Sequence, residues 1–280
     1  MTITTSRSRY LTVAGHEMHV IEWGAEDAPA LVMWHGLART CRDFDTAAAR
    51  LSAHFRVICP DTISRGLSAW SSTPSEDYTF PSYCTHAIEL LDRLGIERCS
   101  WVGTSMGGLL GIILAATGLK GRIERLVVND AGPKLNPVAI DRIRAYVTVM
   151  PTFATMAEFE GFLRLVYQPF GLLSEAEWKV MAESSVRRRD DGRYTSHYDP
   201  KVMEVFAAMT GEVDLWPLWD LIECPTLTLR GAHSDLLLAE TAEEMTTRGP
   251  KSRLVTVPGC GHAPALNVAE QLEVVEAFLR

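Results

Sequence analysis

The sequence of 280 residues lacks both a long hydrophobic run and a block of basic charge. No stretch of roughly 18 apolar residues occurs, and the N-terminus has no apolar core of about 7–15 residues, so we expect neither a transmembrane helix nor a secretory signal. The formal net charge is -8, which is not typical of proteins that bind nucleic acid or anionic membranes. We therefore expect neither nucleic acid nor a membrane as a partner, while a homo-oligomer stays open.

Closely spaced cysteines are also lacking. None of the six cysteines forms a Cys-x-x-Cys pair, so we expect neither a disulfide framework nor a zinc site, and a reducing, cytoplasmic location fits the sequence best. Hydrophobic residues make up 47% and charged residues 22%, which is close to the average of folded globular proteins and excludes wholesale disorder.

What the sequence does contain is an alternation of short apolar runs and amphipathic helical patterns. Runs at 11–14 and 17–23 are typical of a hairpin. Further runs of the buried-strand kind lie at 30–34, 55–59, 99–102, 123–128, 226–230 and 253–257. The alternation predicts an α/β fold with a mostly parallel central sheet and helices on both faces. Such sheets bind ligands at the carboxyl ends of their strands.

The alternation stops between residues 134 and 219. Helical patterns there lie at 139–149, 156–167, 175–186 and 200–209. We predict a helical cap at 134–219, inserted between two parts of an α/β core at 1–133 and 220–280.

The predicted cap is rich in Met and Trp, which most often form core and can also line an apolar substrate surface. Arg39, Arg144 and Arg164 are candidates for binding a substrate carboxylate, although such side chains more commonly lie on the surface.

The clearest chemical motif is Gly-Thr-Ser-Met-Gly-Gly, in which Ser105 lies between a strand-like run and a helical run. A strand-to-helix turn this tight strains the serine, and the flanking glycines remove the clashes that the turn would cause. The serine hydroxyl would then project from the carboxyl edge of the sheet, at the positive end of a helix. The pattern predicts that Ser105 is a nucleophile.

A serine hydroxyl needs a histidine base that is held by a carboxylate. His262 follows the last strand-like run and is flanked by small residues, so it is the best-placed histidine. Two acids follow strand-like runs and compete for the third role. The sequence favours Asp235, and Asp130 is the alternative.

A serine mechanism also needs two donors for the oxyanion of a tetrahedral intermediate. The first should be the amide of Met106, directly after the nucleophile. The second should come from the loop after the run at 30–34, where Gly36 would aim the amide of Leu37 inward. His35 is expected to brace this loop rather than to take part in catalysis.

These motifs together resemble the α/β-hydrolase fold family. The residues that carry the resemblance are His35-Gly36, Asp61 with Arg65-Gly66-Leu67-Ser68, the glycine-rich turn at Ser105, Arg230-Gly231 with Ser234-Asp235, and Gly261-His262. The match covers the chain except 134–219, which looks like the variable helical cap of that family. The resemblance implies Ser105 as nucleophile, His262 as base, Asp235 as acid, and Leu37 and Met106 as oxyanion donors. Some relatives take the acid from the strand before the cap, which keeps Asp130 as the alternative.

Within the family, the sequence resembles small bacterial esterases, enol-lactonases and carbon–carbon bond hydrolases. Dehalogenases and epoxide hydrolases of this fold use an aspartate where Ser105 stands, so the sequence excludes them. Carbon–carbon bond hydrolases of the meta-cleavage type usually carry a tryptophan soon after the histidine, whereas Ala263 and Pro264 follow here.

The function predicted from the sequence is hydrolysis of a small carboxylic ester or lactone through a Ser-His-Asp triad and an acyl-enzyme. This chemistry requires neither a metal ion nor an organic cofactor. Hydrolysis of a carbon–carbon or amide bond by the same triad is the alternative. A non-catalytic small-molecule receptor on this fold is a further alternative of another class.

Overall fold

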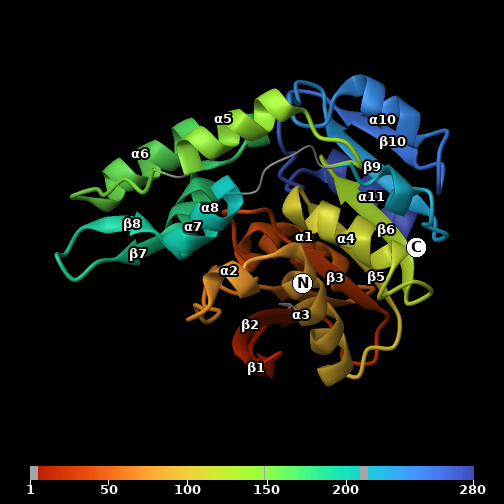
Figure 1. The fold of residues 1–280 in the computed structure, drawn as a ribbon, viewed down its shortest axis with the longest axis horizontal. Helices are drawn as coiled ribbons and strands as arrows, with labels where there is room; N and C mark the ends of the chain where they lie inside the picture. Colours follow the sequence, from red (N-terminus) through yellow and green to blue (C-terminus); the bar gives the residue numbers. More distant parts are fainter. Residues whose placement is uncertain (1–5, 148, 209–213) are drawn as a thin grey trace.

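An eight-stranded sheet runs through the centre of the protein (Figure 1). The computed structural model describes residues 6–147, 149–208 and 214–280. Across the sheet the strands are β1 (Arg7–Val13), β2 (His16–Trp23), β4 (Arg56–Pro60), β3 (Ala30–Trp34), β5 (Cys99–Thr104), β6 (Ile123–Asn129), β9 (Thr226–Gly231) and β10 (Arg253–Val257). β2 pairs antiparallel with β1 and β4, and all other neighbours in this sheet are parallel. The predicted mostly parallel central sheet is therefore confirmed.

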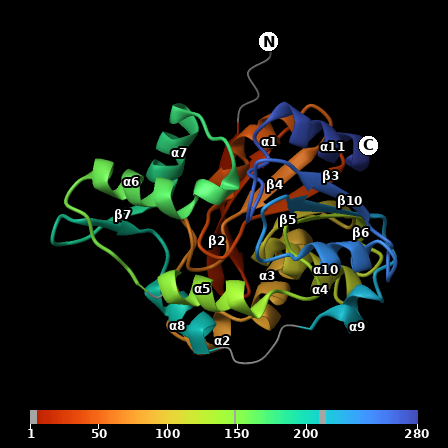
Figure 2. The ribbon, with the colours of Figure 1, turned by 90° about the horizontal axis from the view of Figure 1, so that it is seen from above.

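Both faces of the sheet are apolar because the central strands are buried on two sides. In β3, Val32 and Trp34 join the hydrophobic cluster on one face, whereas Leu31 and Met33 join the cluster on the other. This alternation follows from the two-residue period of a strand. Helices α3 and α4 cover the first face, and α1 and α11 cover the second (Figure 2).

Each helix follows a strand of the sheet or lies in the cap. Their bounds are α1 (Asp45–Leu51), α2 (Pro74–Asp77), α3 (Phe80–Arg93), α4 (Met106–Ala116), α5 (Pro137–Val147), α6 (Met156–Val166), α7 (Glu175–Ser185), α8 (Pro200–Ala208), α9 (Trp216–Trp219), α10 (Ala239–Met245) and α11 (Ala269–Leu279), with 3-10 turns η1 (Cys41–Phe44) and η2 (Gln168–Phe170). Among the described residues, no helix has the length and apolar character needed to cross a membrane.

The chain between β6 and β9 leaves the sheet and forms a layer of helices, α5 to α8, beside its carboxyl edge (Figures 1 and 2). Each of the four predicted helical patterns has its counterpart here. Thr148 and Met209, which belong to two of the predicted ranges, lie outside the described residues. The division of the chain at 134 and 219 stays a prediction.

The cap also contains a hairpin that the sequence does not predict. Strands β7 (Val186–Arg188) and β8 (Tyr194–Ser196) are three residues each, too short to show a period-two pattern. The cap has a small hydrophobic core of its own, in which Phe159 and Leu163 of α6 pack with Trp178 and Met181 of α7. The Met- and Trp-rich composition of this segment therefore serves packing in part.

Buried His35 joins the loops that follow β3 and β4. The His35 ring is completely buried; its Nδ1–H donates to the carbonyl of Gly36 at 2.7 Å, and its Nε2 accepts the amide proton of Thr62 at 3.0 Å. Both bonds require a neutral ring with the proton on Nδ1. Burial in addition lowers the pKa of His35 to about 4, even though the negative charge of Asp61 acts to raise it.

We predict that the free energy of unfolding falls as pH falls from 6.5, the ordinary pKa of the ring, to about 4. In this window the unfolded chain binds a proton at His35 that the folded chain does not, so acid favours unfolding by up to about 3 kcal/mol. Urea denaturation at a series of pH values measures the slope. His197 is also buried, which lowers its pKa to about 3 and adds a loss in the same direction.

The variant His35→Gln should reduce this slope, and His54→Gln should not, because the side chain of His54 is 40% exposed. An unchanged slope in His35→Gln would contradict the prediction.

Candidate active site

Ser105 lies on the turn between β5 and α4, in a strained backbone conformation with φ +53°. Its amide donates to the carbonyl of Asn129 on the neighbouring strand at 2.9 Å. Two glycines allow the turn to close: a Cβ added to Gly103 would lie 2.0 Å from the carbonyl oxygen of Gly107, and a Cβ on Gly107 would lie 2.1 Å from that of Trp34. Both distances are far below a van der Waals contact, so the turn tolerates no side chain at either position.

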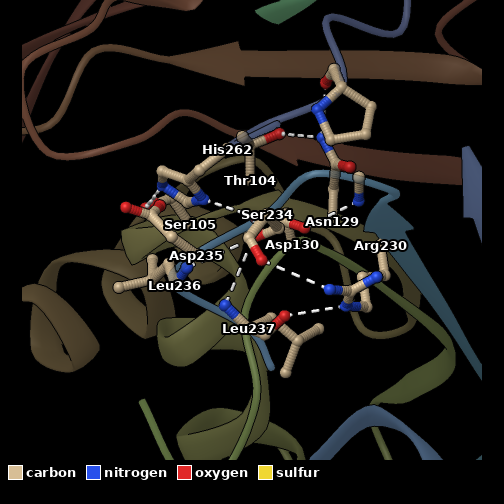
Figure 3. Close-up of polar contacts among 12 residues, drawn as sticks. Thr104, Ser105, Asn129, Asp130, Arg230, Ser234, Asp235, Leu236, Leu237 and His262 are labelled. Atoms are coloured by element: carbon tan, nitrogen blue, oxygen red, sulfur yellow. Dashed lines mark hydrogen bonds and ion pairs between the residues drawn. The ribbon is translucent and has the colours of Figure 1, made fainter. Parts of the chain in front are cut away.

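The hydroxyl of Ser105 is hydrogen bonded to His262, which in turn is bonded to Asp130 (Figure 3). The distance is 2.9 Å from Ser105 Oγ to His262 Nε2, and 2.6 Å from His262 Nδ1 to Asp130 Oδ2. Because a carboxylate only accepts hydrogen bonds, Nδ1 carries the proton of the neutral ring and Nε2 is left to accept the serine proton. This is the arrangement in which an imidazole acts as a general base toward a hydroxyl.

Asp130 follows β6 and has no exposed surface. Besides the histidine, its Oδ1 accepts the amide proton of Gly231 at 2.8 Å, and its Oδ2 accepts the hydroxyl proton of Ser234 at 2.6 Å. A buried carboxylate is costly unless its lone pairs are hydrogen bonded, and here three donors meet that need. Asp130 is therefore held in the orientation that His262 requires.

Asp235 does not contact His262, and the preference of the sequence for this acid disagrees with the geometry. The side chain of Asp235 is 49% exposed and pairs with Arg142 of α5, from Oδ1 to Nη2 at 3.0 Å. Ser234, one residue earlier, is the side chain of this loop that faces Asp130 (Figure 3). Asp130, the alternative acid, follows β6 in a left-handed backbone conformation with φ +53°, and its carboxylate accepts the hydrogen bond from His262 Nδ1.

The two predicted oxyanion donors both border the site. Met106 is the first residue of α4, where an amide has no carbonyl partner within the helix. Leu37 lies in the loop after β3, beside Gly36, at which an added Cβ would be 3.5 Å from Cβ of Ser105. Both line the same cavity as the serine. Their role as oxyanion donors stays a prediction.

Buried Arg65 supports this loop and is a residue that the sequence assigns only to a structural turn. Its Nε donates to the carbonyl of Leu37 at 2.9 Å, and its Nη1 donates to the hydroxyl of Tyr83 at 2.7 Å. A third contact runs from Nη2 to the sulfur of Met106 at 3.6 Å. Arg65 therefore connects the loop after β3 to the start of α4. No local sequence motif predicts this contact, because the residues lie far apart in the sequence.

A cavity of about 550 Å³ lies over Ser105 and His262, between the core and the cap. Its size is within the range of small-molecule sites. Most of its lining is apolar or aromatic, from both core and cap: Tyr78, Phe80, Tyr83, Leu109, Leu135, Ile140, Ile143, Val202 and Phe206. Charged side chains also border it, among them Arg39, Asp43, Arg142 and Asp235.

One cluster has the residue types of a metal site. His19, Cys41 and Asp61 are buried, and their ligand atoms lie within 4.8 Å of one another. Asp61 already accepts from His19 Nδ1 at 2.7 Å and from the amide of Cys41 at 2.8 Å, so its oxygens serve hydrogen bonds that a metal would displace. Burial also raises the pKa of the Cys41 thiol well above its ordinary value, which disfavours the thiolate that binds metals.

Comparison with known proteins identifies the family of this chain. Residues 31–277 match the model of a family described as the alpha/beta hydrolase family. A 3-hydroxybutyrate-oligomer hydrolase from Cupriavidus necator is 39% identical over 273 residues, which cover 94% of this chain and 92% of the relative. A 2-hydroxymuconate semialdehyde hydrolase from Pseudomonas putida is 26% identical over 276 residues, or 97% and 93% of the two chains.

A solved structure of an alpha/beta hydrolase from Novosphingobium aromaticivorans superposes with a TM-score of 0.88 at 35% identity and covers 98% of both chains. The predicted family resemblance and the fold class are thereby confirmed.

We predict that Gly103→Ala destabilises the protein by about 3 kcal/mol, because the added methyl group meets the backbone of Gly107 inside a packed turn. Thermal and urea denaturation measure the change. Gly161→Ala in α6 is the matched control: apart from its chain neighbours and the backbone of its own helix, no atom lies within 4 Å of its added Cβ, so it should gain roughly 0.5–1 kcal/mol through helix propensity. Equal stability of the two variants would show that the turn does not depend on the close approach.

Proposed function

This chain belongs to the alpha/beta hydrolase family, and we propose that it is a serine hydrolase that cleaves a small carboxylic ester or lactone. The observation that carries the proposal is the continuous hydrogen-bonded chain from Ser105 through His262 to Asp130, at the wall of a largely apolar cavity. We propose Asp130, rather than Asp235, as the acid of this triad.

In the first half of the reaction, Ser105 attacks the substrate carbonyl while His262 Nε2 removes the hydroxyl proton. Asp130 stabilises the charged imidazolium by accepting a hydrogen bond from Nδ1–H throughout, and the proton stays on the ring. The amides of Met106 and Leu37 would bind the oxyanion of the tetrahedral intermediate. Collapse of the intermediate breaks the ester bond, and His262 returns the proton to the leaving alcohol.

In the second half, a water molecule takes the place of the alcohol. His262 removes a proton from this water, which attacks the carbonyl of the acyl-enzyme. A second tetrahedral intermediate then collapses, the acid leaves, and Ser105 regains its proton from His262. For a lactone, both products are parts of one hydroxyacid. No step requires a metal ion or an organic cofactor.

Two observations favour an ester over other bonds. The name of the Cupriavidus necator relative refers to an oligomer of a hydroxyacid, in which the units are joined by ester bonds. In addition, Ala263 and Pro264 follow the histidine, whereas carbon–carbon bond hydrolases of this family usually have a tryptophan there. Cleavage of a carbon–carbon bond is the second candidate, because the Pseudomonas putida relative is a hydrolase of a semialdehyde.

We also propose a cytoplasmic location, which the scattered cysteines favour. The proposed partner is a small molecule, the ester or lactone substrate itself.

We predict that Ser105→Ala lowers kcat/KM for a short p-nitrophenyl ester by at least about 10⁴-fold and abolishes labelling by a fluorophosphonate. The variant lacks the nucleophile but keeps the fold, which far-ultraviolet circular dichroism checks. Ester turnover that survives this substitution would refute the serine mechanism. Absence of turnover in the unaltered protein, together with binding of an uncleaved ligand, would favour the receptor alternative.

We predict that Asp130→Asn lowers kcat by about 10⁴-fold, because an amide can donate to Nδ1 and so favours the tautomer in which Nε2 carries the proton. Asp235→Asn is the matched control, with the same change of chemistry on a side chain that contacts Arg142 instead of His262. Its kcat on a neutral ester should change by less than about ten-fold. The opposite order of the two losses would assign the acid to Asp235.

A further inference from the structure

An ion pair crosses the boundary between cap and core at the wall of the cavity. Arg142 lies on α5 of the cap, and Asp235 lies in the loop that follows β9. The guanidinium meets the carboxylate at two points, from Nε to Oδ2 at 3.0 Å and from Nη2 to Oδ1 at 3.0 Å. Both residues line the cavity that contains Ser105 and His262. A carboxylate is therefore already bound to a cap arginine within the substrate cavity.

The other arginines of the cavity are engaged differently. Arg39 is 4% exposed, binds Asp43 and Ser185, and stacks on the ring of Tyr167 with 4.5 Å between the guanidinium carbon and the ring centroid. Releasing it would break several buried contacts at once. Arg144 pairs with Asp141 of its own helix.

The pair of Arg142 and Asp235 is accessible by comparison, since the two side chains are 50% and 49% exposed. An ion pair at this exposure contributes little net stability, because water competes for both charges. Exchanging Asp235 for another carboxylate therefore costs little. The fork of a guanidinium also recognises any planar carboxylate in the same two-point geometry.

We propose that Arg142 recognises a free carboxylate on the substrate, and that Asp235 is an internal placeholder which occupies the guanidinium until the substrate arrives. Before the substrate binds, Asp235 neutralises the arginine and orients its fork. The proposal rests on the proposed function and narrows its substrate class to anionic esters, in which one half carries a carboxylate. The apolar wall formed by Ile140 and Ile143 of the same helix is suited to the uncharged part of the substrate.

Two matched substrate pairs test this recognition, one for each half of the ester. In 3-acetoxybutyrate the carboxylate belongs to the alcohol half of the ester, and 3-acetoxybutanamide carries a neutral amide in its place. In monoethyl glutarate the carboxylate belongs to the acyl half, and ethyl glutaramate carries a neutral amide in its place. Release of acid in a pH-stat gives kcat/KM for each compound. We expect the carboxylate member to be preferred in at least one pair.

The variants Arg142→Met and Asp235→Asn should then act in opposite directions. Arg142→Met removes the binding group and lowers the preference for the carboxylate at least about ten-fold. Asp235→Asn removes the competing carboxylate and raises the preference. If the pair served only to fasten the cap to the core, both variants would shift the charged and neutral substrates equally, and this result would overturn the proposal.

Arg164→Met is the control for the loss of a cap arginine. Arg164 lies on α6, pairs with Glu160 and Glu175, and is not among the residues that line the cavity. This variant should leave the preference unchanged. A loss equal to that of Arg142→Met would also overturn the proposal, as would the lack of any preference in the unaltered protein.

Calorimetric binding to Ser105→Ala separates this inference from the proposed function, because it requires no turnover. In this background we expect Arg142→Met to weaken binding of the preferred carboxylate at least about ten-fold and to leave binding of its amide partner unchanged. If esters are not cleaved but this difference is found, the proposed function fails and the recognition holds. If esters are cleaved and neither binding nor kcat/KM depends on Arg142, the recognition alone fails.

Discussion

The site depends on one buried carboxylate. Asp130 receives hydrogen bonds from three parts of the chain: the end of β9 through Gly231, the following loop through Ser234, and the last loop through His262. A charge without solvent contact is stable only when such donors surround it. The same bonds that stabilise the carboxylate therefore position both loops against the carboxyl end of β6. Nearby Asn129 adds a bond from its Nδ2 to the carbonyl of Pro264, which secures the loop of the histidine a second time.

Close packing of the backbone sets the position of the serine. The chain at Gly103 and Gly107 approaches so closely that β5, α4 and the end of β3 share one compact corner. The loop after β3 is held to this corner by His35 and Arg65, both fully buried. These buried polar groups hold the loop in one conformation, in which both ring nitrogens of His35 and Nε of Arg65 are hydrogen bonded.

The fold and most of the site can be predicted from the sequence where the signal is local. The strand–glycine–serine–glycine–helix pattern places Ser105, and β3 and β10 coincide with their predicted ranges. Long-range polar contacts are where prediction fails. β1 starts earlier than its apolar run, because the polar residues before that run also pair with β2, and Arg9 among them forms an ion pair with buried Glu22. Asp130 and Asp235 both follow strands, and only the backbone conformation at Asp130 and the direction of each side chain decide which one meets His262.

The separate core of the cap has a consequence for how such a protein can diversify. Phe159, Leu163 and Trp178 pack with one another and not with the helices that cover the sheet. α5 and α8 belong instead to the larger cluster that packs on the sheet, through side chains such as Ile143 and Met203. In this scaffold, replacements in α6 and α7 can therefore accumulate during evolution with little penalty for the stability of the part that carries Ser105.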